Sequence, residues 1–155
     1  MHRNVVRVVE AGEVIGVTVV PHEFAESTRT AAEAAAAIGV ELGQIVKSLV
    51  FAVDGTPVLA LVSGDRQLDE TKLAKTAGGS VAVRPDADTV RAATGFPVGG
   101  VPPFGHTGDL PVFIDACLLR YREVWAAAGT PHVNFPLDPH VLASATGGLL
   151  ADITR

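Results

Sequence analysis

A dense run of glycine and proline, from Gly95 to Pro111, is the part of this sequence best suited to holding a reacting group. Glycine lets the backbone approach a ligand closely and proline fixes neighbouring torsions, so such a loop can direct backbone N–H groups at a carbonyl or its oxyanion. A rigid surface crossover would have the same composition. No Gly-Lys-Ser/Thr sequence ends the run, which excludes a nucleotide P-loop. The candidate residues in it are Gly99, Gly100, Val101, Pro102, Pro103 and His106.

A single lysine interrupts the apolar run from Ile45 to Phe51. Lys47 lies at the expected boundary between a helical turn and a strand, so its ammonium group can sit in a pocket. The alternative is a lysine whose stem packs against the protein while its head reaches water. The sequence leaves both interpretations open.

Two more polar residues, His132 and Asn134, alternate with apolar neighbours on an expected strand and can therefore face a cleft. A strand with one solvent-facing side gives the same pattern. Cys117 is interpreted as a small buried hydrophobe rather than a nucleophile. Since the histidines have no zinc-like spacing with one another or with this cysteine, we expect no metal centre and no cofactor.

The elements that must position these residues mix helices and strands without a regular βαβ alternation, which predicts an α+β fold. We expect one domain with a mixed, largely antiparallel central sheet flanked by helices, and the apolar strands 49–53 and 58–63 at the centre of the sheet. Helices or helical turns are expected at 2–11, 31–38, 41–46, 69–77, 86–94 and 138–147, and further strands at 14–20, 80–84, 112–115, 123–127, 132–135 and 149–154.

Bulk properties limit the class of protein and of partner. The 155 residues match one domain, no apolar run is long enough to span a membrane, and the one cysteine cannot form an internal disulfide, so we expect a soluble, cytoplasmic protein. The net charge of -5 argues against sequence-specific DNA binding. Any RNA substrate would be held with few phosphate contacts and a shallow salt dependence.

The order of several short segments resembles the YbaK and prolyl-tRNA-synthetase-associated editing family. The similarity covers nearly the whole chain, and the shared order and spacing carry more weight than any one segment. The segments are Ser27–Glu33, Gly43–Val50, Leu61–Gly64, Thr94–His106, Phe113–Asp115, Val124–Pro131 and Ala151–Ile153.

This resemblance implies an activity: hydrolysis of the ester between tRNA and a wrong amino acid, commonly tRNA(Pro) carrying a small residue such as Cys or Ala. A chain of this length resembles the stand-alone members, which implies trans-editing at the aminoacyl-tRNA acceptor end, beside prolyl-tRNA synthetase. A non-catalytic module that binds an aminoacyl-adenosine end is the alternative. Only the enzyme would release free amino acid with turnover.

The resemblance also implies site residues. Lys47 matches the characteristic polar group of the family's active site, and Gly99 to Pro103 matches its loop. Backbone N–H groups of Gly99 and Gly100 would polarise the carbonyl while water attacks. The remaining expected substrate-binding residues are Thr28, Ser48, Val101, Pro102, Pro103, His106, Thr130, His132 and Asn134.

One departure concerns the side-chain pocket. Some cysteine-specific members carry an aromatic hydroxyl before the capped helix, where this chain has Val20, Pro21 and His22. The sole Tyr121 lies elsewhere in the sequence. The pocket for the amino acid must therefore be lined differently.

Overall fold

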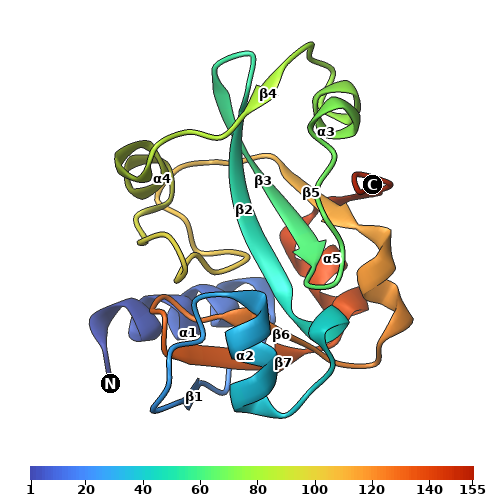
Figure 1. The fold of residues 1–155 in the computed structure, drawn as a ribbon. Coiled ribbons are helices and arrows are strands. Elements are labelled where there is room, and N and C mark those ends of the chain that lie inside the picture. The colour runs from blue at the N-terminus through green and yellow to red at the C-terminus, as the bar shows by residue number, and fades with distance from the viewer.

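The computed structural model describes all residues, 1–155 (Figure 1). Its helices are α1 Arg3–Ile15, α2 Ala31–Ile38, α3 Glu70–Thr76, α4 Ala87–Thr94 and α5 Pro139–Thr146, with 3-10 turns η1 Leu42–Gln44 and η2 Ala116–Arg120. Its strands are β1 His22–Glu23, β2 Val46–Val53, β3 Thr56–Ser63, β4 Ala82–Val83, β5 Val112–Asp115, β6 Val124–Ala127, β7 Val133–Leu137 and β8 Leu149–Ala151.

The strands form two sheets. In the larger sheet, with the order β4-β2-β3-β5-β8, β2 pairs antiparallel with β4 and β3, whereas β5 pairs parallel with β3 and β8. The smaller sheet, β1-β7-β6, is entirely antiparallel. A parallel bridge from Ile45 to Trp125 links the two sheets just before β2. The prediction of an α+β fold with a mixed sheet is confirmed, and its division into two sheets is a finding of the structure.

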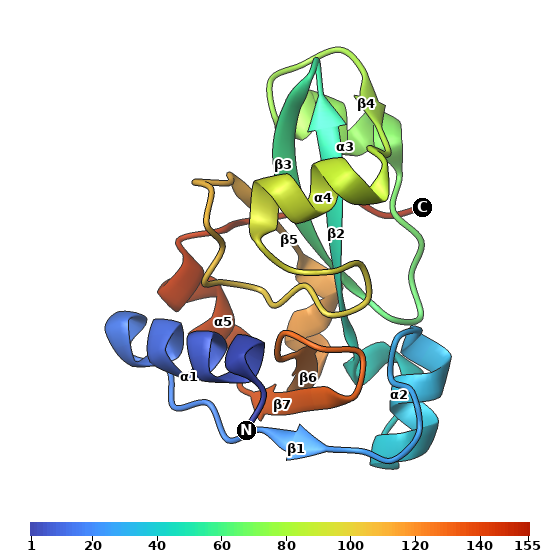
Figure 2. The ribbon, with the colours of Figure 1, turned by 90° about the vertical axis from the view of Figure 1, so that its left-hand side faces the viewer.

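The β2–β3 hairpin is the centre of the molecule, as the apolar runs predicted. Val50 and Leu61 pack into a core with α1 and the Gly/Pro loop, while Phe51 and Val62 pack into a second core with α3. Figure 2 shows α4 and the loop that follows it lying over one side of the hairpin. Because both faces are covered, continuous apolar sequence is what these strands require.

Local signals in the sequence account for the helix and hairpin that border the site. Thr30 and Glu33 form the reciprocal capping box of α2, which ends at Gly39 in a left-handed conformation. Asp54 and Gly55, both with positive φ, make the two-residue turn between β2 and β3. Neither feature depends on distant packing, so both were predictable.

Two predictions at the N-terminus were wrong. Helix α1 does not stop at Gly12 but continues to Ile15 and ends at Gly16, which is left-handed. A side chain at Gly12 would lie 2.6 Å from the carbonyl oxygen of Val17 and 2.7 Å from Val19. The glycine therefore permits close packing instead of ending the helix. Of the residues expected as a strand at 14–20, the first two belong to α1 and 17–20 are irregular chain, in which Val17 and Val19 are buried by that same packing.

Smaller differences affect element ends. β2 begins at Val46, so Lys47 is part of the strand and not at its boundary with a helical turn. The strand expected at 80–84 is reduced to two residues in β4. None of the helices combines the length and the apolar character needed to cross a membrane.

Candidate active site

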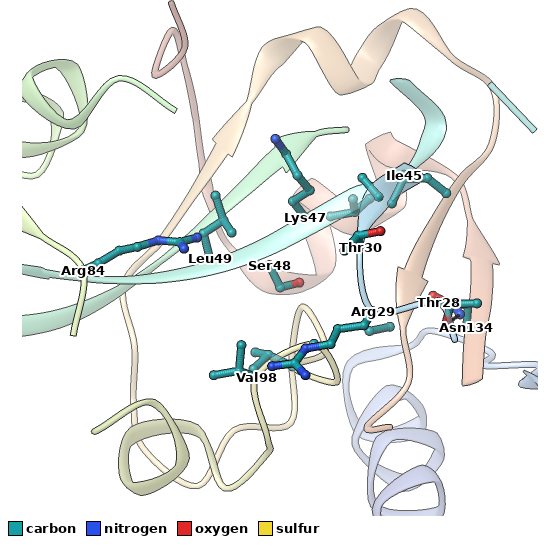
Figure 3. Close-up of a pocket in the computed structure, with 15 residues that line it drawn as sticks. Thr28, Arg29, Thr30, Ile45, Lys47, Ser48, Leu49, Arg84, Val98 and Asn134 are labelled. Atoms are coloured by element: carbon teal, nitrogen blue, oxygen red, sulfur yellow. Dashed lines mark hydrogen bonds between the residues drawn. The ribbon is translucent and has the colours of Figure 1, made fainter. Parts of the chain in front are cut away.

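A cavity of about 370 Å³ lies between β2, the start of α2 and the Gly/Pro loop (Figure 3). It is bordered by segments that are distant in the sequence, and the capping box of α2 and the β2–β3 pairing hold two of its walls. It is lined by Thr28, Arg29, Thr30, Ala31, Ile45, Val46, Lys47, Ser48, Leu49, Arg84, Val98, Gly99, Val101, Ala127 and Asn134.

Neighbouring residues of β2 present two different groups to the cavity. Successive side chains of a strand point to opposite faces, and Figure 3 shows Ser48 directed towards the side of Val98 while Lys47 points the other way. The Lys47 amine donates a hydrogen bond to the carbonyl oxygen of Arg66. The hydroxyl oxygen of Ser48 is buried and has no hydrogen-bond partner. Ser48 therefore brings a hydroxyl without a protein partner to the cavity wall, and the lysine stands at the cavity's rim.

The backbone of β2 also contributes to this site. β3 pairs with β2 over its whole length, but β4 pairs only with Ala52 and Val53, so the remaining edge of β2 carries no neighbouring strand in the sheet. The N–H of Gly64 donates to Ile45, which fixes the alternation of the ladder and turns the N–H and carbonyl groups of Ser48 away from β3. These groups face the open edge.

The Gly/Pro loop is held in place at both ends. Arg7 donates to the carbonyl of Gly95 at 3.1 Å, and its guanidinium lies 4.3 Å from the centre of the Phe96 ring. At the far end, the N–H groups of Thr107 and Gly108 bond to carbonyls of the last turn of α4. The rigidity that the composition predicted is thus supplied by identifiable contacts.

Three loop residues that line the cavity, Val98, Gly99 and Val101, have backbone N–H groups without an acceptor in the protein. The N–H of Gly100 is already bonded to the carbonyl of Pro97 at 3.0 Å. Gly100 instead packs tightly on the Gly129 and Thr130 backbone, where an added Cβ would lie about 3.0 Å away. Gly100 is therefore not a free donor, whereas Gly99 and Val101, on either side of it, are.

A buried polar pair forms another part of the wall. The side-chain amide of Asn134 donates to Thr28 Oγ1 at 2.6 Å, and Thr28 donates to the carbonyl of Pro131 at 2.9 Å. Asn134 is 3% exposed and Thr28 5%, so their orientation is fixed by this chain of bonds. Both sequence-predicted residues lie in the cavity.

The cavity is cationic although the protein is acidic. Arg29, Lys47 and Arg84 line it, and no carboxylate does. Burial lowers the pKa of Lys47, and the neighbouring Arg84 lowers it further, while Asp115 and Asp65 act in the opposite direction. Such a site favours an anionic ligand.

Half of the expected site residues line this cavity: Lys47, Gly99, Thr28, Ser48, Val101 and Asn134. The others lie outside its lining: Gly100, Pro102, Pro103, His106, Thr130 and His132. His106 is largely buried against the carbonyl of Pro102, 2.7 Å from its Nε2, and burial lowers its pKa. His132 is exposed and its ring contacts the carbonyl of Glu26 at 3.1 Å.

Sequence reasoning missed Arg29 and Arg84. Arg29 directly precedes the capping box, and its stem covers Gly99, where an added Cβ would lie 2.5 Å from Arg29 Cγ. Arg84 follows β4 at the far end of the cavity. Neither has a distinctive sequence context, so only the fold brings them to the site. Cys117 is partly buried, its thiol pKa is raised chiefly by burial, and it lies apart from the cavity.

Comparison with known proteins agrees with the fold. Residues 25–145 match the model of the aminoacyl-tRNA editing domain. A solved structure described as a candidate trans-editing enzyme for prolyl-tRNA synthetase is 44% identical, with a TM-score of 0.93 over 100% of this chain and 99% of the other. The chain belongs to the aminoacyl-tRNA editing domain family.

Two curated relatives indicate the settings in which such domains occur. A protein of Enterococcus faecalis, named as a candidate Cys-tRNA(Pro)/Cys-tRNA(Cys) deacylase, is 32% identical over 86% of this chain and 83% of its own. The proline–tRNA ligase of Maridesulfovibrio salexigens is 43% identical over 63% of this chain, a stretch that forms 17% of the ligase. The first relative corresponds to the domain alone, and the second contains it within a larger enzyme.

Proposed function

We propose that this protein is a trans-editing hydrolase that removes a small, wrongly attached amino acid from tRNA(Pro). The observation that carries the proposal is the cavity, where unused N–H donors of Gly99 and Val101 and the unpartnered Ser48 hydroxyl accompany a cationic rim. An aminoacyl-tRNA end presents a neutral ester beside a phosphodiester. The N–H donors and the hydroxyl can bind the ester, and the cationic rim can bind the phosphodiester.

The size of the cavity suits the reacting end of such a substrate. A volume of about 370 Å³ is small among ligand pockets. It fits an aminoacyl group and the sugar that carries it better than a longer stretch of nucleic acid. The buried Thr28–Asn134 pair and Ala127 restrict the side chain that can enter. A hydrophobic wall discriminates one methylene by only about 1–3 kcal/mol, so we expect several small amino acids to be accepted.

In the proposed reaction, water attacks the ester carbonyl and the carbon–oxygen bond to the ribose breaks. The N–H groups of Gly99 and Val101 stabilise the charge that develops on the carbonyl oxygen, and Ser48 can donate to the same oxygen or to the sugar. The expectation that Gly100 is the second donor is replaced here by Val101, because the Gly100 N–H already has an acceptor.

Proton transfer in this scheme relies on the substrate. An aminoacyl ester is already activated, so the substrate's own amine or a ribose hydroxyl can accept the proton of the attacking water, and the departing ribose oxygen takes up a proton. Lys47 binds the ribose–phosphate side, since its amine lies at the rim beside Arg66 and not against the glycine loop. This arrangement requires neither a metal nor a cofactor.

The decisive experiment is deacylation of tRNA(Pro) charged separately with cysteine, alanine, serine, threonine and proline. We expect multiple turnovers on at least one of the small amino acids and no turnover on proline. A non-catalytic binding module would bind the same tRNAs without releasing amino acid above the spontaneous rate, and that outcome would reject the hydrolase. Adding prolyl-tRNA synthetase then tests whether the two proteins cooperate.

A further inference from the structure

A second cavity of about 370 Å³ adjoins the first and continues along β2. Lys47, Leu49 and Arg84 line both cavities, so these three residues form the passage between them. The remaining lining residues of the second cavity are Phe51, Gln67, Leu68, Glu70 and Arg155. A chain-like ligand held in the first cavity can leave through the second one.

The passage is cationic, and neither Lys47 nor Arg84 forms a salt bridge. Glu70 and Arg155 contribute side chains of opposite sign, which leaves Lys47 and Arg84 as the excess charge. Arg84 makes no salt bridge and no side-chain hydrogen bond. Its guanidinium lies 5.7 Å from the centre of the Phe51 ring, which supports the side chain from one side. Its planar donors are free to bind a phosphate oxygen.

Arg84 and Lys47, which carry the same charge, lie near each other in the passage, and this arrangement points to an anionic ligand. Arg84 is near enough to Lys47 to disfavour the charged form of the lysine, and no carboxylate lies between them in the passage. Asp115 and Asp65 offset part of this effect at Lys47, whereas Arg84 has no salt-bridge partner, so an anion bound between the two cations would be stabilised by both. A phosphodiester between them would relieve that repulsion.

We infer that Arg84 is a binding residue for the phosphodiester next to the terminal nucleotide, and that the single-stranded 3′ end of the RNA leaves the active site along β2 between Lys47 and Arg84. The inference rests on the proposed function and adds the direction of the polynucleotide to it. The bases would pass beside Leu49 in the passage and Phe51 in the second cavity.

The test is the salt dependence of binding of an uncharged acceptor-stem minihelix ending in CCA, followed by fluorescence anisotropy. Each phosphate contact with a single strand contributes about 0.7 to the slope of log affinity against log salt. With contacts from Lys47 and Arg84 we expect a wild-type slope of about -1.4 between about 50 and 200 mM salt. Arg84→Ala should lower the affinity about fivefold, the upper range for an exposed charge pair, and reduce the slope by about 0.7.

Two control variants separate a phosphate contact from other effects. Arg84→Lys keeps the charge and should keep the slope. Arg122→Ala removes an exposed arginine that lines neither cavity and should change neither affinity nor slope. An Arg84→Ala protein with a wild-type slope overturns the inference, even if its affinity is reduced. Because minihelix binding does not require hydrolysis, absence of deacylation by the wild type would reject the proposed function without deciding this point.

Discussion

Gly99 allows the loop's part in the site to be tested by one substitution, Gly99→Ala. The residue has φ +88 and supplies one of the unused backbone donors of the cavity. The left-handed conformation costs a non-glycine residue about 1–2 kcal/mol. The new Cβ would also lie 2.5 Å from Arg29 Cγ and push that stem aside. We expect unfolding about 2–8 °C lower and, because the donor moves, a deacylation rate reduced about 100-fold.

Gly16→Ala provides a matched control for that experiment. Gly16 ends α1 with φ +82, and a Cβ there would meet nothing within 4 Å. This variant should lose about as much stability from backbone strain and retain wild-type deacylation. Thermal unfolding and single-turnover deacylation of both variants are to be compared at a temperature where both are folded. Full activity in a folded Gly99→Ala protein would refute the role of the loop donors.

Three further predictions concern single side chains. Ser48→Ala should leave the free energy of unfolding unchanged or higher in urea titrations, since a buried unpartnered hydroxyl is lost, and slow deacylation about tenfold. Burial lowers the pKa of His106 in the folded protein, so the unfolded chain takes up a proton first as the pH falls. The free energy of unfolding should therefore decrease below about pH 6.5, and it should decrease less in His106→Gln. Deacylation above the spontaneous rate should decline with rising pH through the lowered pKa of Lys47, with a midpoint below 10.5.

The sequence could predict the features that depend on residues close together in the chain. The capping box at Thr30, the turn at Asp54–Gly55 and the irregular Gly/Pro loop need only neighbouring residues, and each is present in the structure. The continuous apolar runs of β2 and β3 likewise placed the hairpin at the centre of the sheet. The family resemblance, which rests on the order of such segments, led to the same fold.

What the sequence could not predict depends on contacts between distant segments. Glycine often ends a helix, so the sequence predicted a stop at Gly12. In the structure Gly12 packs closely against Val17 and Val19 within α1, which continues to Ile15. The sequence predicted that the Gly100 N–H binds the substrate, but in the structure this N–H donates to the carbonyl of Pro97. Arg84 reaches the cavity only because β4 pairs with the far end of β2. These positions follow from tertiary packing.

The central claim is that one substrate end is held from two sides, with Lys47 of β2 on its ribose–phosphate part and free N–H donors of the loop on its ester carbonyl. The most direct test is single-turnover release of alanine from Ala-tRNA(Pro) by the wild type and by Lys47→Ala, with thermal unfolding measured for both. We expect Lys47→Ala to be folded and about 10- to 100-fold slower, the effect of losing one hydrogen bond from a charged group. A folded Lys47→Ala protein that releases alanine at the wild-type rate would contradict the account.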